Sequence, residues 1–125
     1  MPARVFISYR RVDDTWARNL KSASEALPEL ELYTFPDDEA SSNDWRTVCR
    51  SLICASDGVV CLVGSTTAGS SNISWELDEA RQVGLPVLLA GPEASALARL
   101  RGDDEAETVE DVRPEVVLER LRNLV

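Results

Sequence analysis

Glu76 is the carboxylate whose position in this sequence best fits a role in chemistry. An apolar segment, residues 58–63, leads into a loop of small polar residues, 64–71, and then into a helix-like segment that contains Glu76. A glutamate in the first turns of a helix that follows a buried parallel strand lies near the carboxyl edge of the sheet. Open α/β sheets bind their ligands at that edge. We therefore take Glu76 as the candidate catalytic residue.

The place of Glu76 on its helix supports this choice. Successive helix residues turn by about 100°, so the apolar residues of this segment form one buried stripe. That stripe comprises Ile73, Leu77, Ala80 and Gly84. Glu76 lies about 65° from its middle, on the border, whereas Glu79 lies about 125° away, towards solvent. Partial burial at the border raises a carboxylate's pKa and strengthens its field on a ligand. The alternative is that Glu76 caps the helix or pairs with an arginine.

The first predicted strand brings further polar groups to the same edge. It ends in Ser8, Tyr9, Arg10 and Arg11. Arginines at this position can hold phosphate groups through paired hydrogen bonds, and the alternative is that they pair with nearby acids. The 64–71 loop offers hydroxyls and backbone amides. It lacks the Gly-Lys-Ser/Thr of a P-loop, and no Gly-x-Gly-x-x-Gly occurs in the chain, so the usual nucleotide fingerprints are absent.

Other residue types narrow the chemistry. The sequence has no histidine, which removes Ser-His and Cys-His nucleophiles and histidine-based zinc sites, and we expect no metal. Cys49, Cys54 and Cys61 form no Cys-x-x-Cys pair and are expected to be buried, reduced thiols. Trp75 has two interpretations: it folds back over the preceding loop, or it is an exposed aromatic at an assembly surface.

The elements that must position these residues alternate between strand and helix. Strands are predicted at 5–9, 30–35, 59–63 and 85–90, with a short fifth near 108–109. Five helices are predicted as well. The first starts after a cap at Asp13 or Asp14 and runs to about Leu27, and the second covers 45–53. The third ends near Gly84, the fourth covers 93–101, and the fifth starts at Pro114. This alternation predicts a parallel sheet covered on both faces. The polar loop 36–43 is long for such a unit, which is typical of a functional loop.

Composition sets further bounds. The 125 residues are expected to form a single domain, 1–125, with one sizeable core. The net charge of −9 argues against binding to nucleic acid or to an anionic membrane. No apolar run approaches the roughly 20 residues that span a bilayer, and the N-terminus enters a strand without a signal peptide. We therefore expect a cytoplasmic location.

Two motifs carry a family resemblance. The segment Phe6 to Arg11, Phe-Ile-Ser-Tyr-Arg-Arg followed by aspartate, resembles the opening of Toll/interleukin-1 receptor (TIR) domains. The later run of apolar strand, small-residue loop and Trp75-Glu76-Leu77, with Ala80, is similar to the family's Glu-Leu-x-x-Ala helix segment. The Trp-Glu pair resembles the bacterial TIR-like proteins of Thoeris antiphage defence. The 36–43 loop would correspond to the family's BB loop.

The resemblance implies a flavodoxin-like three-layer sandwich, with a central parallel five-stranded sheet of order 2-1-3-4-5 and helices on both faces. Catalytic TIR domains cleave the nicotinamide–ribose bond of NAD with a helix glutamate that matches Glu76. NAD is then a substrate, and no cofactor is implied. The expected substrate-binding residues are Ser8, Tyr9, Arg10, Arg11, Phe35, Asp37, Gly64, Ser65, Ser71 and Trp75.

The function expected from these observations is cleavage of NAD to ADP-ribose or a cyclic ADP-ribose isomer, used as a defence signal. One alternative is a non-enzymatic adaptor that acts through TIR–TIR assembly. Another is an N-glycosyl transferase that acts on nucleosides. The expected partners are NAD or a related nucleotide, and either further copies of this chain or another TIR or effector protein.

Overall fold

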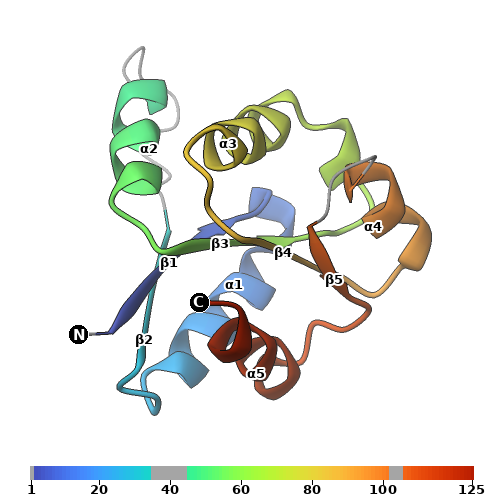
Figure 1. Ribbon diagram of the computed structural model, residues 1–125. Helices are drawn as coiled ribbons and strands as arrows, with labels where there is room; N and C mark the ends of the chain where they lie inside the picture. Colours follow the sequence, from blue (N-terminus) through green and yellow to red (C-terminus); the bar gives the residue numbers. More distant parts are fainter. Residues whose placement is uncertain (1, 35–44, 102–105) are drawn as a thin grey trace.

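A parallel five-stranded sheet forms the centre of the molecule (Figure 1). The computed structural model describes residues 2–34, 45–101 and 106–125. The strands are β1 (Ala3–Ser8), β2 (Leu30–Thr34), β3 (Gly58–Leu62), β4 (Val87–Ala90) and β5 (Glu107–Val109). Their order is β2-β1-β3-β4-β5, and every neighbouring pair is parallel. The structure thus confirms the flavodoxin-like architecture and the short fifth strand.

Helices cover both faces of the sheet. The helices are α1 (Asp14–Ser24), α2 (Trp45–Cys54), α3 (Ser71–Gln82), α4 (Ala94–Arg101) and α5 (Pro114–Leu124). Figure 1 shows α1 and α5 below the sheet and α2, α3 and α4 above it. Within the described part of the chain, no helix combines the length and apolarity needed to cross a membrane.

The core has two halves, one on each side of the sheet. Val5 and Ile7 of β1 pack against the α1 and α5 side, whereas Phe6 packs against the α2 and α3 side. Strand side chains alternate between the two faces. Ser8 therefore shares a face with Phe6 and points towards α3. All five residues of β3 are buried, as expected for the central strand of a covered parallel sheet.

Local signals set the ends of α3, the helix that carries Glu76. The Ser70 side chain caps its first turn by accepting a hydrogen bond from the Ile73 backbone N–H at 3.3 Å. Gly84 follows its end with φ of 77°, a conformation that favours glycine, as predicted. Gly84 therefore lies beyond the helix, and the buried stripe comprises Ile73, Leu77 and Ala80.

The first helix begins where it was predicted, directly after Asp13, but it ends earlier than predicted. It stops at Ser24 rather than near Leu27, and the Ser24 hydroxyl donates to the Lys21 backbone oxygen at 2.6 Å. Such side-chain bonds to the backbone compete with helix continuation. At the other end, a 3-10 helix of residues 11–13 precedes α1, and Asp13 makes no side-chain cap.

Candidate active site

Glu76 lies beside the end of β1, on the sheet face that α3 covers. The Ser8 hydroxyl donates a hydrogen bond to Oε2 of Glu76 at 2.6 Å, and Ser8 itself is buried. The two residues are 68 positions apart in sequence and meet because Ser8 is the last residue of β1. Within residues 2–34, 45–101 and 106–125, Glu76 has no arginine partner, and Ser70 rather than Glu76 caps α3.

Burial dominates the electrostatics of Glu76. It raises the pKa of this carboxyl to about 7, and the hydrogen bond from Ser8 opposes that rise because it stabilises the charged form. Glu76 is thus close to half ionised near neutral pH. A carboxyl group with such a pKa, at the ligand-binding edge of a parallel sheet, has the properties of a functional group rather than of a surface charge.

Two buried thiols lie within electrostatic reach of Glu76. Burial, and next the charge of Glu76, raise the pKa of both Cys49 and Cys61 to about 12, so both remain neutral thiols. Cys49 belongs to α2 and Cys61 to β3, so the charge of Glu76 acts on a buried thiol of each of these elements. All three cysteines are unpaired, as expected, but Cys54 is exposed, contrary to the prediction, because it is the last residue of α2.

A second carboxylate occupies the loop side of this sheet edge. A methyl group on Gly64 would lie 2.5 Å from both carboxylate oxygens of Asp13, so the Asp13 side chain would have to move to make room for it. The buried Thr67 hydroxyl accepts from the Gly64 N–H at 2.8 Å, and it points its own hydrogen towards the Leu62 backbone oxygen at 3.5 Å. Burial raises the pKa of Asp13, and Thr67 and the charge of Arg10 oppose it. The sequence suggested only a helix cap for Asp13, because nothing in it marks contact with residue 64.

The other residues predicted at the site are spread around this edge. Tyr9 packs on the α1 and α5 side, and its hydroxyl donates to Asp14 at 3.1 Å. Arg10 is exposed and reaches the Thr66 backbone oxygen at 3.5 Å, a long contact. Arg11, Ser65 and Ser71 are exposed. Phe35 and Asp37, with the 36–43 loop, lie outside the described residues.

Trp75 packs against α2, which contradicts both interpretations offered for it. Its ring meets that of Trp45 edge-on, with the centroids 5.3 Å apart. The guanidinium of Arg46 lies over both rings, 5.6 Å from Trp45 and 5.4 Å from Trp75. Trp75 therefore belongs to the contact between α2 and α3. The sequence did not single out Arg46, since its neighbour on α3 is 29 residues away.

The same contact corrects the prediction for Glu79. Its side chain is only 13% exposed, and both of its oxygens accept from Arg50 of α2 at 3.1 Å. The helix wheel gave its direction relative to the buried stripe correctly. The neighbouring helix α2 covers that flank, so the direction away from the sheet is not solvent.

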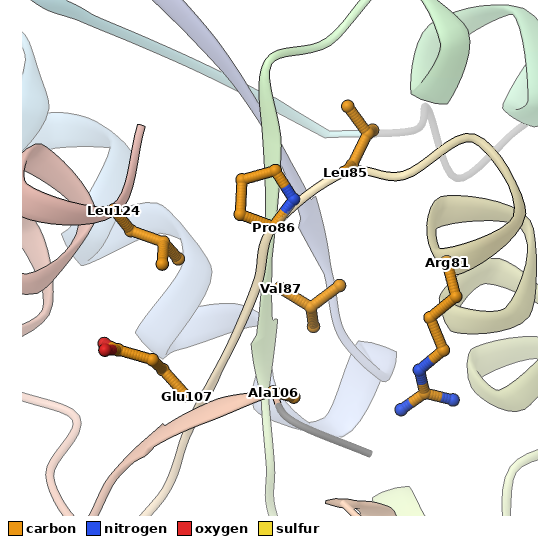
Figure 2. Close-up of a pocket in the computed structure, with 7 residues that line it drawn as sticks. All are labelled: Arg81, Leu85, Pro86, Val87, Ala106, Glu107 and Leu124. Carbon is orange, nitrogen blue, oxygen red and sulfur yellow. The ribbon is translucent and has the colours of Figure 1, made fainter.

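A separate cavity lies at the opposite edge of the sheet. It has a volume of about 240 Å³ and lies between Arg81, Pro86, Val87, Glu107 and Leu124 (Figure 2). Val87 and Glu107 are the first residues of β4 and β5, so this cavity is at the amino end of the strands. Glu76, beside the last residue of β1, is at the carboxyl end. The cavity is therefore distinct from the candidate active site.

The described residues contain no group of three or more side chains suited to holding a metal ion. Two partly buried carboxyl groups, Glu76 and Asp13, lie at the carboxyl ends of β1 and β3, the edge at which open α/β sheets bind their ligands.

Comparison with solved structures defines the class of fold more closely. The TIR domains of the activated Roq1 resistosome, which directly recognises the pathogen effector XopQ, align with a TM-score of 0.60 and 12% identity, over 97% of this chain and 71% of that one. The CMP N-glycosidase BcmB of Clostridium botulinum aligns with a TM-score of 0.62 and 15% identity, over 96% of this chain and 98% of that one. At these identities, the likeness shows the fold alone.

The sequence itself decides the family. The model of the Thoeris protein ThsB, TIR-like domain, matches residues 6–96, from the Phe6 motif through the Glu76 helix and β4. The chain therefore belongs to this TIR-like family. No curated protein matches the chain.

Proposed function

We propose that this protein cleaves the nicotinamide–ribose bond of NAD, with Glu76 as the catalytic carboxylate. The observation that carries the proposal is the Glu76 side chain itself: it is half-buried beside the end of β1, accepts a hydrogen bond from Ser8 at 2.6 Å, and has its pKa raised by burial to about 7. The family match supports the proposal, because it spans both motifs that define this edge.

The chemistry needs one carboxylate and no metal. As the glycosidic C–N bond breaks, nicotinamide leaves with the bonding electrons, which neutralise its ring charge, and the ribose carbon becomes oxocarbenium-like. An ionised Glu76 stabilises that positive charge and can accept hydrogen bonds from the ribose hydroxyls. Attack by water, which loses a proton, gives ADP-ribose. Attack by the adenine of the same molecule gives a cyclic isomer, and in a defence pathway either product serves as the signal.

A second candidate is hydrolysis of the N-glycosidic bond of a nucleoside or nucleotide. The fold neighbour BcmB is a CMP N-glycosidase and matches over nearly the full length of both chains, which is the reason to test this substrate class. The same carboxylate chemistry applies, because both reactions develop positive charge at a ribose carbon.

We also propose that activity requires self-association. The TIR domains of Roq1 come from an activated resistosome, which is an assembly. An always-active enzyme that consumes NAD would harm its host, and assembly supplies a form of control.

The test is incubation of the purified protein with NAD, with nicotinamide release followed and the products separated by chromatography. CMP and deoxynucleosides are offered in parallel. We expect Glu76→Gln to lower NAD cleavage by about 10²-fold or more, since a lost transition-state contact of roughly 3 kcal/mol has that effect.

Asp78→Asn is the matched control, because it removes the same charge two residues further along α3 at an exposed side chain. It should retain most of the activity. Base release from CMP without nicotinamide release would favour the second candidate. No release from any substrate, at concentrations where the protein is assembled, would favour the adaptor.

A further inference from the structure

Arg46 is the arginine whose surroundings prepare it for an anionic ligand. It lies in the first turn of α2, and its guanidinium is placed over the rings of Trp45 and Trp75. Two ring contacts hold a guanidinium plane by cation–π attraction and restrict its rotamers. A side chain that is already ordered loses less entropy when it binds a ligand.

Arg50, one turn further along the same helix, provides a comparison because its guanidinium is paired with a carboxylate. Arg50 also lies over Trp75, at 5.6 Å, but it donates two hydrogen bonds to Glu79 at 3.1 Å. For Arg46, no ion pair with a carboxylate occurs among residues 2–34, 45–101 and 106–125, and its side chain is exposed. Of these two ring-stacked arginines one turn apart, Arg50 is paired with a carboxylate, whereas Arg46 has no such partner among the described residues.

The position of Arg46 places that charge near Glu76. Cys49 is three residues after Arg46, on the same side of α2, and the charge of Glu76 acts on its thiol. From the α3 side, Trp75, which Arg46 contacts, directly precedes Glu76.

We propose that Arg46 binds the phosphate or pyrophosphate group of the nucleotide whose glycosidic bond Glu76 cleaves. The identity of the nucleotide rests on the proposed function, but both candidate substrate classes carry such a group. A guanidinium presents a planar pair of N–H donors that matches phosphate oxygens. The positive end of the α2 dipole adds to the attraction for an anion.

Binding of three probes by calorimetry tests the proposal without any need for turnover. The probes are inorganic pyrophosphate, ADP-ribose and nicotinamide riboside, of which only the last lacks phosphate. We expect Arg46→Gln to weaken binding of pyrophosphate and ADP-ribose about tenfold, since hydrogen bonds between charged groups are the stronger kind. Binding of nicotinamide riboside should stay within about twofold, as only phosphate contacts are lost.

Arg50→Gln is the matched control, because it removes the same charge from the same helix and the same ring stack. It should change each affinity by less than about twofold, because the Arg50 guanidinium is already hydrogen-bonded to the Glu79 carboxylate. Equal weakening by both substitutions would overturn the proposal in favour of a general charge effect. Failure of the wild type to bind pyrophosphate or ADP-ribose would also overturn it. If NAD is not cleaved but Arg46-dependent pyrophosphate binding is seen, the anion site stands and the NAD activity does not.

Discussion

Burial of Glu76, opposed by the hydrogen bond from Ser8, sets the pH range of the proposed reaction. The ionised form of Glu76 is the one that stabilises an oxocarbenium-like centre, so activity should fall as the pH drops below about 7. Ser8→Ala removes a donor that favours the ionised form and leaves burial unopposed.

The pKa of Glu76 should therefore rise in Ser8→Ala, and the acid limb of the kcat/KM profile should move to higher pH. A net hydrogen bond to a charged group of about 1.5 kcal/mol corresponds to a shift of about one pH unit. Ser95→Ala, at an exposed position on α4, is the control. An unchanged acid limb in Ser8→Ala would show that another group governs the profile.

The raised pKa of Glu76 also predicts how stability depends on pH. In the unfolded chain Glu76 loses its proton near pH 4.5, whereas in the folded protein it keeps the proton up to about pH 7. Between these values the folded state binds more protons, so stability falls as pH rises through this window. The Glu76→Gln variant has no titrating carboxyl at this position, so its free energy of unfolding does not fall in this way.

Urea unfolding of both proteins at several pH values tests this. At pH 4 the two should have similar free energies of unfolding. Above pH 7 Glu76→Gln should be the more stable, by up to roughly 3 kcal/mol. The same difference at every pH would mean that Glu76 is not desolvated in the folded state.

At the scale of elements, the turn after β3 is joined to the turn after β1 by the contact between Gly64 and Asp13. Gly64→Ala would place a methyl group 2.5 Å from the Asp13 carboxylate oxygens, so the Asp13 side chain must move. We expect a loss of about 1–3 kcal/mol in the free energy of unfolding. Gly69→Ala, in the same loop, meets nothing within 4 Å and should change stability by less than about 0.5 kcal/mol.

A double-mutant cycle shows whether the Asp13 contact causes the loss. With Asp13→Ala the carboxylate oxygens are gone, so adding Gly64→Ala should cost much less than it does in the wild type. Additive losses would place the strain elsewhere, for example in the backbone. The cycle therefore tests the contact between Asp13 and residue 64, rather than the general effect of glycine on the flexibility of the loop.

At the scale of the whole molecule, the net charge of −9 opposes the self-association proposed for activity. Salt screens repulsion between like-charged copies, with a Debye length of about 10 Å at 0.1 M. Raising the ionic strength should therefore promote assembly and increase specific activity at a fixed protein concentration. Specific activity should also rise with protein concentration.

Light scattering and nicotinamide release, measured on the same samples, check both trends. Arg46 contacts lose strength in salt as well, so KM for NAD should be recorded separately from kcat. Constant specific activity in a protein that stays monomeric across the range would exclude control by assembly.

The sequence by itself determined the alternation of strands and helices, and with it the parallel sheet and the edge at which Glu76 lies. These features depend on residue periodicity and on caps such as Ser70 and Gly84, which are local. The helix wheel also placed Glu76 correctly on the border of a buried stripe, because Ile73, Leu77 and Ala80 alone define that stripe.

The tertiary structure alone decided which groups meet at that edge. The Ser8–Glu76 bond joins residues 68 positions apart, and no local pattern marks one as the partner of the other. The helix wheel gives a direction relative to a helix's own apolar face, but it is silent about the next element. Glu79 and Trp75 point away from that face and are nevertheless covered, because α2 packs along the flank of α3.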